Sequence, residues 1–424
     1  MLSLKYILEN EKKVKVALKN RNFDLKTFNE LIKEANKRGK LMFEAQSKKA
    51  ELTKFSKEFA KHKNDKVKLS ELQKQVAIIK KEQVKLEEEA KNIEKKVDEM
   101  LIRIPNISLD DVPLGKDEKQ NKVLKNHDNL GRGLVSGVLP HYTIASNLNI
   151  IDLERAVKMS GSRYVIYKGL GARLARALMN FMLDLHVKNG YEEYSVPFIV
   201  KPEILFGTGQ LPKFKEDLFA LEDTKNYLIP TAEVPLTNYY NNEIIDLSKP
   251  IRMTAFTECF RSEAGSSGKD TKGIIRNHQF KKVELVKIVS EKDWEAEFNQ
   301  MLEQAKLVLD ELELPYRELL LCTGDLGFAS RKTIDIEVWL PSEIKYREIS
   351  SVSYMGDFQA RRAMIRYKNE DGENVYAHTM NGSGLAIDRL IAAILENYQN
   401  KDGSITIPKK LVPYMGGISK ITKE

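Results

Sequence analysis

Apolar residues recur at alternating steps of three and four through much of the first hundred residues, which is the spacing of a coiled-coil seam. Between Val67 and Met100 only Gln83 interrupts the seam, and its apolar members are Leu69, Leu72, Val76, Ile79, Leu86, Ala90, Ile93, Val97 and Met100. Upstream, the same spacing takes in Phe28, Leu31, Ala35, Met42, Ala45, Leu52 and Phe59, with polar breaks at Arg38, Lys49 and Ser56. We predict an antiparallel helical hairpin with arms of about 35 residues and about 50 Å, joined by a turn at residues 61–66.

The pattern changes at Pro105, the first proline of the chain. Beyond it, alternating segments and helical segments are mixed with proline- and glycine-containing turns. This mixture indicates an α+β domain at residues 105–424, preceded by a helical arm at residues 1–104.

Residues 253–260 and 278–288 alternate as the two strands of a hairpin do. Period-two geometry places four residues on one face of the second strand, namely Phe280, Lys282, Glu284 and Val286. Arg261 stands where the intervening glycine-rich loop begins. Because an arginine fork binds phosphate and a phenylalanine ring stacks on a base, the pattern suits a nucleotide bound on an antiparallel sheet. A solvated charged hairpin is the alternative interpretation.

The formal charge of +8 belongs to the predicted arm. Residues 1–100 contain 26 Lys and Arg against 17 Asp and Glu, whereas the rest of the chain contains 43 against 44. Within the arm, residues 31–70 hold 12 basic and 5 acidic side chains. Such a concentration favours a polyanionic partner whose binding weakens as salt rises. A solvated lysine-rich helix pair would show the same composition.

Several classes of protein are disfavoured by composition. The first residues lack the apolar run of a signal peptide, and no segment approaches the roughly 20 apolar residues of a membrane span. Cys259 and Cys322 are the only cysteines, and neither HExxH nor CxxC occurs. We therefore expect a cytoplasmic protein with no membrane partner and no intrinsic zinc.

Longer motifs point to one family. FRSEAG followed by IRNHQF, at residues 260–265 and 275–280, resembles motif 2 of the class II aminoacyl-tRNA synthetases, and GSGLAIDR resembles motif 3. GYEEYSVPFIV, which contains Pro197, is similar to motif 1. The TGQLPKF, PTAE and DGSITIP segments resemble the seryl-tRNA synthetase family in particular. The resemblance covers nearly the whole chain and implies a catalytic domain with a central antiparallel sheet flanked by helices.

The resemblance also implies an ATP site. Arg261 is expected at the α-phosphate and the serine carboxylate, Glu263 beside adenine and Arg389 at the γ-phosphate, and these three are the expected catalytic residues. The other residues expected to bind ATP are Ser262, Arg276, which is expected on the outer phosphates, Phe280, which is expected to stack on adenine, Glu348, Ile349, Ser350 and Ser351.

Glu348 and Ser351 are the expected ligands of a magnesium ion that accompanies ATP. On a regular strand these two side chains would point to opposite faces. We therefore predict a bend or bulge at Ile349 to Ser350.

Serine recognition is expected from a second set of residues, carried over from the PTAE, motif 2 and motif 3 positions: Thr231, Ala232, Glu233, Arg261, Glu284, Asn381 and Ser383. Lys269 in the motif 2 loop is expected either to contact the acceptor end of tRNA or to be solvated. Asp388 departs from the family, which commonly has a small residue beside the motif 3 arginine, and its carboxylate is expected to face solvent or a neighbouring base.

The resemblance implies an enzyme that forms seryl-adenylate from ATP and serine and then loads tRNA(Ser), and also tRNA(Sec) where an organism has one. It further implies a homodimer built through the motif 1 region and an arm that grips tRNA. Two alternatives stay open from the sequence. One is a related enzyme that loads a carrier protein, and the other is a coiled-coil RNA-binding protein whose catalytic domain has decayed.

Overall fold

The computed structural model describes residues 1–61, 65–265, 270 and 272–423. The chain forms two compact units, one comprising Leu2–Pro105 and the other Asn106–Glu424 together with Met1. Among the residues described, no helix is both long enough and apolar enough to cross a bilayer.

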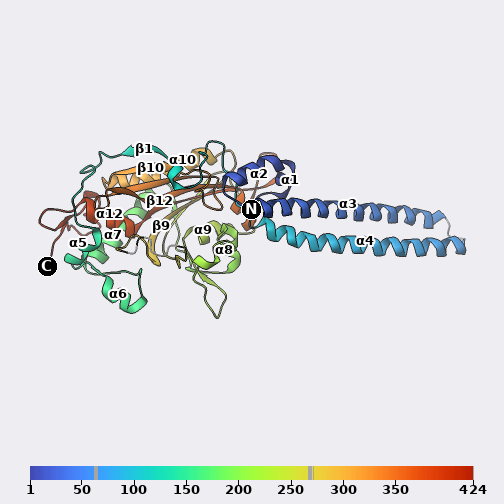
Figure 1. Ribbon diagram of the computed structural model, residues 1–424, viewed down its shortest axis with the longest axis horizontal. Helices are drawn as coiled ribbons and strands as arrows, with labels where there is room; N and C mark the ends of the chain where they lie inside the picture. Colours follow the sequence, from blue (N-terminus) through green and yellow to red (C-terminus); the bar gives the residue numbers. More distant parts are fainter. Residues whose placement is uncertain (62–64, 266–269, 271, 424) are drawn as a thin grey trace. The chain divides into compact units, whose positions relative to one another are not determined.

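The first unit is helical (Figure 1). Its elements are α1 (Leu4–Glu9), α2 (Glu11–Asn20), α3 (Leu25–Lys61) and α4 (Lys66–Leu101). The two long helices lie side by side, which confirms the predicted hairpin. Residues 62–64 of the predicted turn lie outside the described residues. Helix α4 begins at Lys66, the last residue of that turn, with Asp65 as its N-cap, whose carboxylate accepts the Lys68 N–H at 3.1 Å.

The seam between the long helices follows the predicted spacing on α4, where Ile79, Ala90, Ile93 and Val97 are buried. On α3 three predicted positions are wrong, because Met42, Lys49 and Ser56 are exposed and the residue before each of them lies nearer the seam. Lys48 shows the reason for one shift, since its ammonium reaches Glu82 of the other arm at 2.8 Å. An average period of 3.5 leaves the choice between two adjacent positions to such cross-helix contacts.

The second unit is built on an eight-stranded sheet in the order β1-β10-β11-β12-β15-β9-β8-β4. Its neighbours pair antiparallel except β4 with β8. The strands are β1 (Lys122–His127), β4 (Glu192–Glu193), β8 (Ile251–Phe260), β9 (Gln279–Val289), β10 (Tyr316–Leu320), β11 (Lys332–Leu340), β12 (Lys345–Gly356) and β15 (His378–Ala386). A central, mainly antiparallel sheet and a helical hairpin confirm the predicted α+β class.

Three amphipathic helices, α7 (Leu170–Lys188), α10 (Trp294–Glu311) and α12 (Ile387–Asn397), cover one face of this sheet. Leu178, Phe298 and Leu390 from these helices share a core with Val283 and Leu285 of β9. The alternate residues of β9 point to the opposite face, as period-two geometry requires. On that face the later residues of β9 pack in a second core, whereas Phe280 and Lys282 line a cleft.

Shorter elements frame that opposite face: α8 (Pro202–Thr208), α9 (Glu233–Thr237) and α11 (Phe358–Ala363). The remaining helices are α5 (His141–Asn147) and α6 (Leu153–Ser160), with 3-10 turns at Glu118–Gln120, Lys215–Asp217, Asn238–Tyr240 and Lys409–Leu411. Small sheets pair β2 (Ile151–Asp152) with β3 (Ile166–Tyr167), β5 (Ile199–Val200) with β6 (Tyr227–Leu228) and β16 (Ile405–Thr406) with β17 (Lys420–Ile421), and join β7 (Ile244–Ile245), β13 (Arg366–Lys368) and β14 (Asn374–Tyr376).

Candidate active site

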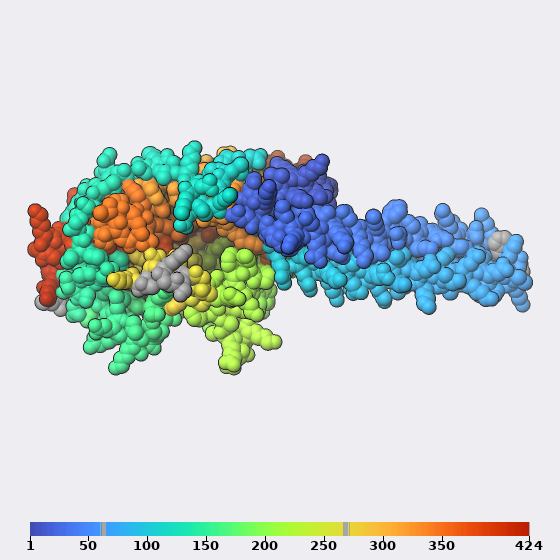
Figure 2. All heavy atoms as spheres, in the orientation of Figure 1, coloured from blue at the N-terminus to red at the C-terminus, as the bar shows by residue number. Residues whose placement is uncertain are grey.

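Two adjoining clefts open on the face of the sheet that α7, α10 and α12 leave uncovered. Figure 2 shows a recess between the yellow-green segment that carries α8 and α9 and the orange strands. The first, here called the arginine cleft, is lined by Arg261, Glu263, Ile274, Ile275, Arg276, Asn277, Phe280, Lys282, Glu348, Ile349, Ser383, Ala386, Asp388 and Arg389. The second, the glutamate cleft, contains Thr231, Glu233, Ser351, Gln359 and Asn381 among its lining. Arg261, Lys282, Glu348 and Ser383 line both, so the two clefts are continuous.

The three arginines of the arginine cleft are held by the chain itself. The Arg261 guanidinium lies 5.0 Å from the centre of the Phe280 ring, and its Nε donates to the Pro230 carbonyl at 3.3 Å. Arg389 Nε donates to the Ile275 carbonyl at 3.1 Å. Both guanidinium groups are thus held by backbone carbonyls, and Arg389 Nη1 also lies 3.6 Å from the Glu348 carboxylate.

Arg276 is held differently, by carboxylates. Its Nη1 is 2.7 Å from Glu263 Oε2, and its Nε is 3.5 Å from Asp270. Asp270 also pairs with Arg347 at 2.9 Å. Burial raises the pKa of Asp270, but Arg347 and Arg276 outweigh it and hold the pKa below its ordinary value. Asp270 therefore ties the described part of the motif 2 loop to Arg276, which precedes β9, and to Arg347 on strand β12 by charge.

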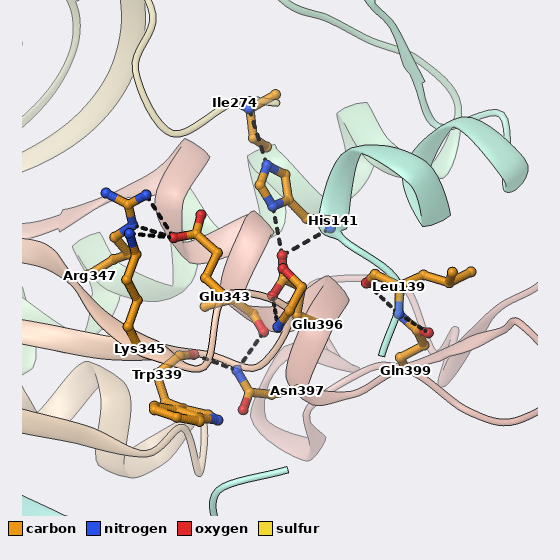
Figure 3. A network of polar contacts seen from close by, with 12 residues as sticks. Leu139, His141, Ile274, Trp339, Glu343, Lys345, Arg347, Glu396, Asn397 and Gln399 are labelled. Carbon is orange, nitrogen blue, oxygen red and sulfur yellow. Dashed lines mark hydrogen bonds and ion pairs between the residues drawn. The ribbon is translucent and has the colours of Figure 1, made fainter. Parts of the chain in front are cut away.

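The return of the motif 2 loop rests on a buried histidine (Figure 3). His141 Nε2 accepts the Ile274 N–H at 3.3 Å, so the ring proton sits on Nδ1, which donates to Glu396 at 2.8 Å. Gly273 has φ +76°, and a Cβ there would come within 2.1 Å of His141 Nε2. Only glycine allows the loop to approach the imidazole so closely.

Strand β12 contains the predicted irregularity. Ser350 pairs with Ile336 and Glu348 pairs with Glu337, so Ile349 is an extra residue opposite β11. This is a β-bulge, and it brings Glu348 and Ser351 to the same cleft. The prediction of a bulge at Ile349 to Ser350 is confirmed.

The glutamate cleft has an acidic floor. Glu233 lies at the start of α9, and its backbone N–H donates to Thr231 Oγ1 at 3.2 Å. Burial, and secondarily the nearby Glu284, raise the pKa of Glu233 to about 7. Glu284 is fully buried, with Lys282 Nζ 2.5 Å from one oxygen and Asn381 Nδ2 donating to the other at 3.0 Å.

Four predicted site residues lie behind the lining of the two clefts, and one of them is the buried Glu284. Ser262 donates its hydroxyl to the Glu216 carbonyl. Ala232 packs in the core beneath α9. Ser350 donates to the Ser383 carbonyl at 2.8 Å. The suggested tRNA contact of Lys269 lies outside the described residues.

The expectation for Asp388 is wrong. Its side chain faces neither solvent nor a base, because one oxygen accepts the Tyr167 hydroxyl at 2.6 Å and the other accepts the Lys281 backbone N–H at 2.8 Å. Sequence reasoning also gave no role to Lys282 or Gln359, which line the glutamate cleft. The alternation of β9 already placed Lys282 on the same face as Phe280, and this pattern could have indicated that Lys282 belongs to the site. Gln359 lies outside every motif that was recognised.

Comparison with known proteins identifies first the class of protein and then the family. Residues 216–398 match the tRNA synthetase class II core domain (G, H, P, S and T), so the second unit is the core of a class II aminoacyl-tRNA synthetase. Residues 1–108 match the seryl-tRNA synthetase N-terminal domain. The serine–tRNA ligase of Mycoplasmopsis agalactiae is 69% identical over 98% of this chain and 99% of its own length. The chain belongs to the seryl-tRNA synthetase family.

Solved structures agree with that membership. The seryl-tRNA synthetase of Pyrococcus horikoshii, crystallised with ATP, superposes with a TM-score of 0.95 at 34% identity and covers both chains fully. The cytoplasmic serine–tRNA ligase of Naegleria fowleri, crystallised with AMP, gives a TM-score of 0.88 at 29% identity over 98% of this chain and 96% of its own.

Proposed function

We propose that the protein activates L-serine with ATP and then transfers serine to the terminal ribose of tRNA(Ser). In the first step a serine carboxylate oxygen attacks the α-phosphorus, the bond to the bridging oxygen of the β-phosphate breaks, and pyrophosphate leaves. In the second step a ribose hydroxyl attacks the acyl carbon and AMP leaves. The observation that carries the proposal is the continuity of the two clefts at Arg261, which lets one guanidinium face both the α-phosphate and the serine carboxylate.

The arginine cleft supplies charge and position rather than proton transfer. Arg261, Arg276 and Arg389 contact the α-phosphate, the outer phosphates and the γ-phosphate, while Phe280 stacks on adenine and Glu263 lies beside it. Stabilising the charge that develops at phosphorus and holding the attacking oxygen in line supply most of the acceleration. No side-chain general base is needed, because the nucleophile is a carboxylate.

The glutamate cleft recognises serine. Glu233 and Thr231 receive the ammonium, and Glu284 with Asn381 and Ser383 surrounds the hydroxyl. Glu284 is buried, and Asn381 Oδ1 has no hydrogen-bond partner in the described structure, so an amino acid without a hydroxyl leaves polar groups unmatched. Sites of this kind reject the analogue lacking the hydroxyl by about 10⁴ to 10⁵, whereas an added methyl is excluded less strongly. Alanine is refused well and threonine less well.

The residues present fit a magnesium ion that enters with ATP. Glu348 keeps half of its side chain exposed and shares a face with Ser351. Asp335, which pairs with Ser351 across the strands, has a buried Oδ1 with no hydrogen-bond partner in the described structure. Hard oxygen donors with room for water suit this cation. When bound, it neutralises phosphate charge, and Glu348 and Ser351 are the residues that hold it.

The two units have separate tasks in this proposal. Residues 1–104 form the tRNA-binding arm, whose phosphate contacts position the tRNA by shape, and residues 105–424 form the catalytic domain. The enzyme acts in the cytoplasm as a homodimer built through the motif 1 region around Pro197. It also serylates tRNA(Sec) in an organism that has one.

ATP/pyrophosphate exchange with each amino acid in turn tests the proposal, because it reports adenylate formation without the right tRNA. Exchange with serine supports it, and exchange with a different amino acid would overturn the specificity residues. Loss of exchange in a folded dimer with magnesium would favour the coiled-coil RNA-binding alternative. Transfer to tRNA(Ser) then separates the enzyme from one that loads a carrier protein.

A further inference from the structure

A single buried glutamine connects three parts of the glutamate cleft. Gln359 lies on α11 and is 1% exposed. Its Nε2 donates to the Thr208 carbonyl at 3.1 Å and to Glu233 Oε1 at 2.7 Å. Its Oε1 accepts the hydroxyl of Thr379 at 2.6 Å. The side chain therefore joins the end of α8, the start of α9 and strand β15 through one amide.

The chemistry of the partners fixes which way this amide faces. The backbone carbonyl of Thr208 can only accept, so the NH₂ group must be on its side. The second N–H of that group then points at Glu233, which must present an accepting oxygen. The oxygen of the amide then faces Thr379, which is fully buried and donates its hydroxyl to it.

The position of Glu233 depends on this bond more than on its other contacts. Its backbone is held by Thr231, but Gln359 is the hydrogen-bond partner that the structure gives its carboxyl group. The charged groups that act on this carboxyl are Glu284, which lies buried behind the lining, and Lys282 and Arg261, which line the clefts. A donor fixed behind the carboxyl keeps one oxygen engaged and leaves the other to face the cleft.

We infer that Gln359 is a positioning residue for the amino-acid substrate, which holds the Glu233 carboxylate as an acceptor for the substrate ammonium and joins it to the loop that follows α8. The inference rests on the proposed function, because it takes the glutamate cleft to be the serine subsite. Gln359 does not itself contact substrate in this account. It acts through Glu233.

The test is the kinetics of ATP/pyrophosphate exchange by the full-length Gln359→Met variant, which keeps the length of the side chain and removes all three hydrogen bonds. KM for serine should rise about tenfold or more, the effect of losing one hydrogen bond to a charged group, while KM for ATP changes less than about twofold. The low-pH limb of kcat/KM for serine should also move to higher pH, because a donor to the ionised carboxyl has been lost.

Gln304→Met is the matched control. Gln304 is also buried, and its Nε2 also donates to a backbone carbonyl, that of Asn189 at 3.0 Å, but it lies on α10 on the other face of the sheet. This control should leave both KM values unchanged. Equal rises of the two KM values in Gln359→Met, or an unmoved pH limb, would overturn the inference and leave Gln359 a purely structural residue.

A milder variant covers the case in which Gln359→Met does not fold. Thr379→Val removes only the hydrogen bond to the amide oxygen and keeps the two bonds of the NH₂ group, and it should raise the serine KM selectively by a smaller factor. No selective rise in this variant would refute the inference. Absence of serine-dependent exchange in the unmodified protein would instead refute the proposed function, so the two failures are distinguishable.

Discussion

The raised pKa of Glu233 makes serine activation dependent on pH near neutrality. Burial is the main cause of the shift to about 7, and Glu284 adds to it. The proposed contact with the substrate ammonium needs the ionised carboxylate. As pH falls through about 7, the group gains a proton and the contact weakens, so kcat/KM for serine falls on the acid side.

The magnitude follows from the pKa. At about pH 6 roughly one-eleventh of Glu233 is ionised in the free enzyme, and at about pH 8 roughly ten-elevenths, so kcat/KM for serine should rise about tenfold across this interval. The assay is pyrophosphate exchange at saturating ATP and magnesium with serine varied. Glu233→Gln removes the titrating group, and it should lower the activity at about pH 8 by a larger factor than at about pH 6.

Taking the ratio of the unmodified protein to Glu233→Gln at each pH cancels the titration of ATP and of serine itself, since both forms of the enzyme experience it equally. The ratio should therefore report Glu233 alone. A ratio that stays constant between about pH 6 and 8 would refute the assignment, because it would mean that the acid limb belongs to another group.

Three further outcomes are expected. Arg389→Ala should abolish adenylate formation and leave tRNA affinity, measured by filter binding, nearly intact; a large loss of binding would contradict the phosphate assignment. Deletion of residues 31–70 should spare serine-dependent exchange and cripple aminoacylation, whereas equal loss of both would mean that the arm is needed for folding. Glu396→Gln should lower the free energy of unfolding by about 1.5–3 kcal/mol at neutral pH, since His141 and Ser342 donate to this carboxylate. Burial raises the pKa of Glu396 but these donors lower it overall, so the deficit should shrink as pH falls through that depressed pKa, and a deficit independent of pH would contradict the account.

Local periodicity was enough to predict the elements that position the site. The alternation of residues 278–288 identified β9 and the face that carries Phe280 and Glu284, because successive side chains of a strand point to opposite faces and Val283 and Leu285 pack in the core under the helices. The bulge at Ile349 followed from a stricter condition. Two ligands three residues apart cannot share a face of a regular strand, so the expected chemistry required the irregularity.

Partners distant in the sequence could not be predicted in this way. Glu233 is 126 residues from Gln359, and Tyr167 is 221 residues from Asp388. Neither pair belongs to a repeating pattern, and each is brought together only by the packing of separate elements around the sheet. The error over Asp388 has this origin, since burial of its carboxylate required a phenol that no local signal connected to it.

The three arginines of the arginine cleft illustrate how such distant contacts prepare the site. Arg261 is oriented by a backbone carbonyl and a ring face, so it keeps its positive charge while losing rotational freedom before a phosphate arrives. Arg389 is oriented by the Ile275 carbonyl but also lies 3.6 Å from the Glu348 carboxylate. Arg276 is oriented by Glu263 and Asp270, and these carboxylates offset its charge. A phosphate that engages Arg276 must compete with them, whereas one that engages Arg261 need not. The α-phosphate therefore meets the better prepared cation, at the position where the proposed reaction requires the most exact placement.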